Sequence, residues 1–182
     1  MANEILVKDG TPVVWANSAD FSDTNNGFTR THQLDLTGVV DTEAREGAKA
    51  DLGATRAAKY AVRVGIEFDV APTAGKTVEF YWSASHSGTA GTGNDGGCTG
   101  ADADYKNGEE NEWCAQLLLM GILKVTNDAA TTVQYATINN GFVPPQRYGQ
   151  VVVKNKGGQA FEGDAAEMFV ALIPNTDEFQ GE

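Results

Sequence analysis

The stretch that decides the fold reads Tyr60-Ala61-Val62-Arg63-Val64-Gly65-Ile66-Glu67-Phe68-Asp69-Val70. Its large apolar residues fall on every second position, while Arg63, Glu67 and Asp69 fall between them. A strand sends alternate side chains to opposite faces, whereas a helix repeats about every 3.6 residues and would scatter this pattern around its surface. The stretch therefore predicts a β-strand with one apolar face and one polar face.

Strand-like runs recur along the chain, separated by Gly, Pro, Asn and Asp. Pro72 and Gly75 suit a chain reversal, so residues 77–85 are predicted to return as the antiparallel partner of 60–70. Further strands are predicted at 12–15, 32–36, 115–125, 131–138, 150–154 and 167–173. This number of strands favours an all-β, single-domain β-sandwich, jelly-roll-like, with a long Gly-rich acidic loop.

The segment 41–52 departs from the strand pattern, because it is rich in Ala and charged residues. It predicts a short surface helix with Asp41 or Thr42 as its N-cap, and a loop is the alternative.

Composition sets limits on the partners of this chain. Its 182 residues include 13 Lys and Arg against 25 Asp and Glu, a net charge of −12, and 41% are hydrophobic. This apolar content predicts one folded domain over residues 1–182 rather than a disordered acidic tail. The scattered basic residues argue against nucleic acid and anionic membranes as partners. We expect synthesis in the host cytoplasm without a signal peptide, because Met1–Asp9 has no basic and apolar leader pattern.

The loop from about 86 to 113 carries the candidate chemistry. Hard oxygen ligands for a structural calcium ion are gathered there, although the spacing is not that of an EF-hand. The calcium candidates are Asp102, Asp104, Asn107 and Glu109. A hydrolase that uses two carboxylates of this loop is a weaker alternative. Such an enzyme needs one carboxyl group with a raised pKa, whereas water around this loop keeps both groups charged. No other cofactor is indicated.

Two cysteines, Cys98 and Cys114, lie at the edges of the same loop. A disulfide would close the loop, and two reduced thiols are the alternative in a cytosolic product.

Catalytic machinery is otherwise absent from the sequence. His32 and His86 are the only histidines, and no serine stands in a nucleophile-elbow motif. The chain is therefore predicted not to be an enzyme. Trp113 and Tyr105 leave open a carbohydrate-binding module, while Trp82 is expected in the core.

Two surfaces are predicted as interfaces. The N-terminal residues 1–10, with Ile5, Leu6 and Val7, resemble an extended arm that adds a strand to a neighbour; an edge strand of the chain's own sheet is the alternative. The second surface is stiff and partly apolar. It comprises Phe142, Val143, Pro144, Pro145 and Tyr148.

The order of several segments resembles that of small virion-associated proteins of tailed bacteriophages. These segments are 60–68 with 72–83, the glycine-rich 88–94, 100–103, 142–149, and 167–174 with the ending 177–180. The resemblance implies a non-enzymatic, jelly-roll-like capsid decoration or cement protein, located in the virion. It also implies a homo-oligomer, with a trimer favoured, that binds the major capsid protein or other virion proteins. A tail or fibre component that contacts a receptor through the Gly-rich loop is the alternative.

Overall fold

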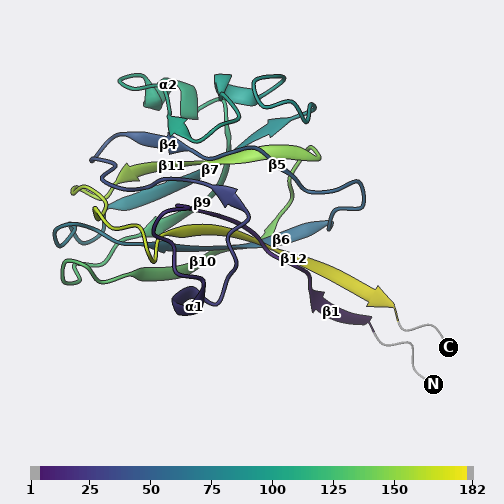
Figure 1. Cartoon of the computed structure of the whole chain (residues 1–182), viewed down its shortest axis with the longest axis horizontal. Coiled ribbons are helices and arrows are strands. Elements are labelled where there is room, and N and C mark those ends of the chain that lie inside the picture. The colour runs from purple at the N-terminus through teal and green to yellow at the C-terminus, as the bar shows by residue number, and fades with distance from the viewer. Residues whose placement is uncertain (1–4, 180–182) are drawn as a thin grey trace.

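Strands in two sheets are the main regular elements of the protein, which is consistent with the all-β prediction. The computed structural model describes residues 5–179, and of these the side chains of 5–8, 24, 25 and 177–179 are not described. Strands account for 40% of the structure and helices for 6%, and the sheets do not close into a barrel (Figure 1).

The first sheet has the strand order β10-β6-β12-β2-β3, and β1 pairs with the end of β12. Its strands are β1 (Ile5–Asp9), β2 (Val13–Ala16), β3 (His32–Gln33), β6 (Lys59–Ile66), β10 (Gln134–Phe142) and β12 (Phe169–Phe179). All pairs in this sheet are antiparallel except β2 with β3.

The second sheet has the order β8-β4-β11-β7-β9, and β5 also pairs with β11. Its strands are β4 (Ala44–Glu46), β5 (Ala50–Asp51), β7 (Thr77–Ser85), β8 (Ala103–Asp104), β9 (Leu118–Lys124) and β11 (Tyr148–Lys156). The helices are short: α1 (Asp23–Asn26), the 3-10 turn η1 (Asp95–Gly97) and α2 (Glu110–Cys114).

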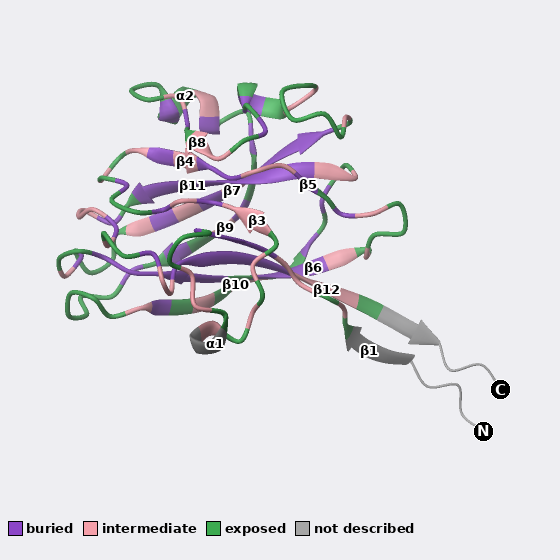
Figure 2. Ribbon diagram, in the orientation of Figure 1, coloured by how far each residue is buried: buried purple, intermediate pink, exposed green. Residues whose placement is uncertain are grey.

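The main core is made of buried residues from both sheets, which lie on the strands that Figure 2 colours as buried. Val62, Val64 and Ile66 of β6 have no exposed surface, as their spacing predicted, whereas Val70 lies beyond the strand and is 51% exposed. Trp15 of the first sheet meets Trp82 of the second edge to face, with ring centroids 5.8 Å apart. Trp82 is fully buried, as expected.

The predicted pairing of 60–70 with 77–85 is wrong. β6 pairs with β10 and β12, whereas β7 pairs with β11 and β9 in the other sheet. The turn at Pro72 and Gly75 therefore carries the chain from one sheet to the other. The alternation of apolar residues specifies which face of a strand is buried. Two strands that face each other across the core satisfy this alternation as well as two strands paired side by side do.

The helix predicted over 41–52 is also wrong. Ala44–Glu46 and Ala50–Asp51 are the short strands β4 and β5, both antiparallel to β11. Ala44 and Glu46 are buried there. Tertiary contacts outweigh the weak helix preference of an Ala-rich segment. Of the predicted strand 32–36, only His32 and Gln33 pair with another strand, which is β2.

Candidate functional site

The long acidic loop forms a layer over the outer face of the second sheet (Figure 2). We call residues 86–117, which include η1, β8 and α2, the cap. Beneath it lies a small second core of Ala44, Cys98, Tyr105, Cys114, Leu117 and Val152. The loop is thus a packed part of the fold rather than a solvated excursion.

A single ammonium group organises the glycine-rich part of the cap. Lys49, which lies between β4 and β5, points its Nζ into the turn formed by residues 85–92. Nζ donates to Ser85 Oγ and to the carbonyl oxygens of Ser87, Thr89 and Thr92, at distances between 2.7 and 3.0 Å. These carbonyls have a charged donor, which explains how an irregular glycine-rich turn keeps one conformation.

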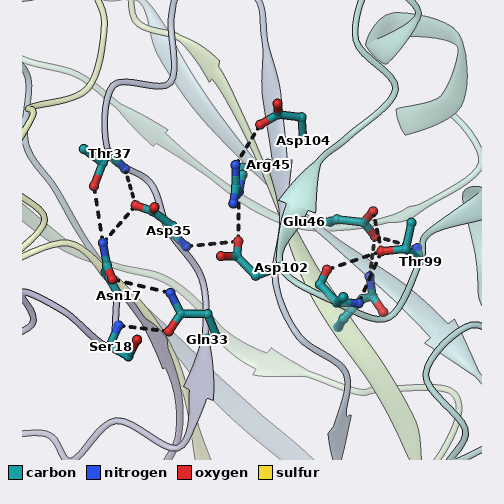
Figure 3. A network of polar contacts seen from close by, with 12 residues as sticks. Asn17, Ser18, Gln33, Asp35, Thr37, Arg45, Glu46, Thr99, Asp102 and Asp104 are labelled. Atoms are coloured by element: carbon teal, nitrogen blue, oxygen red, sulfur yellow. Dashed lines mark hydrogen bonds and ion pairs between the residues drawn. The ribbon is translucent and has the colours of Figure 1, made fainter.

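The predicted calcium ligands do not converge on a common point. Arg45 binds Asp102 and Asp104 instead, with 2.8 Å from Nε and from Nη1 to the respective Oδ1 atoms (Figure 3). Glu109 accepts a hydrogen bond from Trp113 Nε1 at 3.0 Å, and Asn107 is exposed. Within residues 5–179, no three His, Cys, Asp or Glu side chains are grouped as metal ligands. Arg45 supplies the positive charge that the sequence interpretation assigned to an ion.

A buried carboxylate connects the cap to the sheet. Glu46 of β4 is 1% exposed and accepts hydrogen bonds from the Thr99 backbone N–H and hydroxyl, at 2.9 and 3.0 Å (Figure 3). Gln150 Nε2 donates to the same carboxylate at 2.6 Å. Burial raises the pKa of Glu46, and the hydrogen bonds oppose that rise. Sequence reasoning missed both Arg45 and Glu46, because their partners lie far away in the chain.

Cys98 and Cys114 are free thiols, and both are buried in the second core. Burial raises the pKa of both, to about 11 for Cys114. The structure therefore contains the reduced pair, and the possible disulfide is not formed.

The two aromatic residues considered for sugar binding do not form an open platform. Tyr105 is 1% exposed, and its hydroxyl donates to the Gly96 carbonyl oxygen at 2.8 Å. The Trp113 ring is covered on one face by the Lys106 ammonium, 4.4 Å from its centroid.

The predicted contact patch at 142–148 is only partly at the surface. Phe142 is 4% exposed and packs against Trp82, and Pro144 is also buried. Their burial contradicts the prediction of these two residues as interface contacts: Phe142 ends β10 and turns toward the core, and Pro144 is buried just beyond that strand. Val143 and Pro145 are exposed, and Tyr148 is half-buried at the start of β11.

The predicted N-terminal arm is paired within its own chain. The backbone of Ile5, Leu6 and Val7 lies in β1, opposite Phe179, Glu178 and Asp177 of β12. We call Ile5–Asp9 together with Asn175–Phe179 the terminal ribbon, and it extends away from the two sheets (Figure 1). Residues 1–4 of the predicted arm lie outside the described residues, as do the side chains of Ile5, Leu6 and Val7.

No protein family, curated protein or solved structure matches the chain. Among residues 5–179, no helix has the length and apolar character needed to cross a membrane.

Proposed function

We propose that the protein is a non-enzymatic structural component of a bacteriophage virion, a capsid decoration or cement protein that attaches through its terminal ribbon. The sequence resemblance supplies the virion assignment. The ribbon is the observation that carries the mode of attachment.

Strand pairing supports a jelly-roll order. Eight strands remain when the short or terminal β1, β3, β5 and β8 are set aside. Counted along the chain, the first of these strands pairs with the eighth (β2 with β12) and the second with the seventh (β4 with β11). The third pairs with the sixth (β6 with β10) and the fourth with the fifth (β7 with β9). This nested antiparallel pattern arises when one long hairpin rolls over itself. Jelly rolls occur in viral capsid and lectin domains, so the order agrees with a virion role without specifying one.

The ribbon offers backbone groups to a partner. On one side, β12 pairs with β6 only as far as Asn175, and no further strand pairs with its edge at 177–179 among the described residues. On the other side, β1 pairs with β12 alone in that part of the chain. An open edge of this kind can accept a strand from a neighbouring subunit, with main-chain hydrogen bonds providing affinity.

A surface hollow lies at the base of the ribbon, on the side of the open β12 edge. Its volume is about 330 Å³, and it is lined by Thr55, Arg56, Ala57, Ala58, Lys59, Asn175 and Thr176. A strand added at the edge would have space there for side chains. Repeated contacts of this kind over a shell would be multivalent, which raises the total strength of attachment without a deep pocket.

Removing β1 tests the attachment. Deletion of residues 1–9 removes none of the described residues that form the main core. We expect the deleted protein to remain folded and to lose its binding to virions that lack the native protein. The substitution Val70→Ser, at an exposed position outside the ribbon and outside the patch at 142–148, is the matched control and should bind normally. Equal occupancy of particles by the deleted and full-length proteins would refute the ribbon as the attachment element.

The proposal includes a homo-oligomer, with a trimer favoured, and binding to the major capsid protein. Light scattering of the purified protein should give three times 19.3 kDa. A tail or fibre component remains the second candidate on the same resemblance, and the copy number per particle separates the two.

A further inference from the structure

Lys154 is a lysine buried beneath the cap. It lies on β11 and is 2% exposed. Its side chain is on the outer face of the second sheet, because it stands two positions from Val152, which belongs to the second core. Burial of an ammonium group costs free energy unless the charge is paired and its N–H groups find acceptors.

Asn111 of α2 supplies the contact to this amine. Lys154 Nζ donates a hydrogen bond to Asn111 Oδ1 at 2.6 Å. Among the described residues, Nζ forms no other hydrogen bond and no ion pair within 4 Å. The ammonium has three N–H donors, and its one acceptor is a neutral amide oxygen. A reaction that removed the positive charge from this buried position would therefore be favourable.

A carboxylate stands beside the pair. Glu79 of β7 is directly opposite Lys154 in the antiparallel ladder, so both side chains project from the same face of the sheet. The Tyr81 hydroxyl and Lys156 Nζ each donate to Glu79 at 2.8 Å. Burial acts to raise the pKa of Glu79, but these hydrogen bonds outweigh it and leave the pKa below its ordinary value. Glu79 is therefore ionised at neutral pH and can accept a proton.

We propose that Lys154 and Asn111 form an intramolecular isopeptide bond, with Glu79 as the proton acceptor. Glu79 takes one proton from the Lys154 ammonium, and the neutral Nζ attacks Asn111 Cγ. As the Nζ–Cγ bond forms and the Cγ–Nδ2 bond breaks, a second proton passes from Nζ to Nδ2, which leaves as ammonia. The ammonia takes the proton from Glu79 and departs as ammonium. No oxidant or reductant is consumed.

The surroundings of the pair suit this reaction. The hydrogen bond already holds the amine against the carboxamide, which removes most of the entropic cost of bringing the two groups together. Asn111 is exposed, so the leaving ammonia has a path to solvent. The product is a neutral amide, and the positive charge leaves the buried position with the ammonium ion.

The bond would join the cap to the second sheet. It would enclose residues 111–154, a segment that contains β9 and β10. A cross-link of this kind restricts the unfolded chain as a disulfide does, but it cannot be reduced. The inference does not depend on the virion role.

Peptide mapping of the purified, folded chain by mass spectrometry tests the bond directly. Trypsin cuts after free lysine and arginine, so an acylated Lys154 leaves residues 148–156 in one piece, joined to residues 107–124. We expect this linked pair, with a mass one ammonia below the sum of the two peptides. A succinimide at an Asn-Gly pair such as Asn140-Gly141 also loses ammonia, but it joins no peptides.

Asn111→Ala should abolish the linked pair and lower the Tm, because the cap is then no longer tied to β11. Asn107→Ala is the matched control, since it removes another exposed asparagine of the cap, and it should stay linked. Glu79→Gln keeps the size of the side chain but cannot accept the proton, so it should form the linked pair much more slowly.

The proposal is overturned if the folded chain yields residues 107–124 and 148–154 as separate peptides. It is also overturned if the only loss of ammonia is found at an Asn-Gly pair, or if Asn107→Ala abolishes the linked pair as Asn111→Ala does. Linkage of Glu79→Gln at the original rate would overturn the role of Glu79 as proton acceptor.

Discussion

Gly149 of β11 lies directly against the indole of Trp82, and a Cβ atom at position 149 would stand 2.3 Å from Trp82 Cζ2. Trp82 in turn contacts Trp15 of the other sheet and Phe142 of β10. The missing side chain at 149 therefore creates the space in which the central aromatic cluster of the core is packed. Sheets that face each other over large rings need such small residues at the points of closest approach.

Gly149→Ala should destabilise the protein by roughly 2 kcal/mol, because the rings are enclosed on all sides and cannot move away. Urea unfolding followed by tryptophan fluorescence measures the change. Gly141→Ala is the control, since nothing lies within 4 Å of its virtual Cβ. Similar losses for both variants would show that the effect comes from the backbone rather than from the Trp82 ring.

Lys49→Met should loosen the glycine-rich turn of the cap. The substitution keeps the apolar stem but removes the ammonium that binds Ser85 and three carbonyl oxygens. We expect faster amide exchange over residues 86–94 and a loss of about 1 kcal/mol in stability. The exposed Lys124→Met should leave exchange in this turn unchanged. Equal protection in both variants would contradict the organising role of Lys49.

Stability should rise as the pH falls from about 7 toward 5, in part through Glu46. Burial raises the pKa of Glu46 above its ordinary 4.5, so the folded state binds a proton more tightly than the unfolded state does. The proton therefore stabilises the fold, and this contribution is lost as the pH rises through the raised pKa. Glu67 acts in the same direction.

Glu46→Gln should flatten this pH dependence without disrupting the site. Its amide oxygen can keep accepting from the Thr99 N–H and Gln150 Nε2, and its amide nitrogen can donate to the Thr99 hydroxyl oxygen. Urea unfolding at several pH values between about 7 and 5 measures the slope, which cannot exceed roughly 1.4 kcal/mol per pH unit for one proton. An unchanged slope in the variant would mean that Glu46 does not titrate in this range.

Both thiols should resist modification in the folded protein. Burial holds the pKa of Cys98 and Cys114 well above ordinary values, so little reactive thiolate is present at neutral pH. A thiol reagent such as DTNB should react slowly with native protein and should release two equivalents quickly in urea. Rapid reaction of either thiol in the native state would show that the cap opens readily.

The fold class could be predicted from residues 60–70, because a period of two is a local property of strands. The strands that pair with it could not be predicted. Its neighbours β10 and β12 lie far along the chain, and nothing in the alternation distinguishes a lateral partner from a strand across the core. The segment 41–52 failed for a related reason. Its short strands exist only because β11 offers them an edge.

The candidate site depended even more on long-range contacts. The acidic character of Asp102 and Asp104 was visible in the sequence, but Arg45 is more than 50 positions away and gave no local signal. Tyr105 looked like an exposed loop aromatic, and its burial follows from the cap as a whole. Glu67 was assigned to the polar face of its strand, and only the structure shows that it is buried.

The most direct test of the central claim is the copy number of this protein in purified virions, measured by quantitative mass spectrometry against the major capsid protein. A decoration protein that follows the symmetry of the shell should give about one copy per capsid subunit. A handful of copies per particle would instead place it in the tail or a fibre. Its complete absence from purified particles would contradict the structural role proposed here.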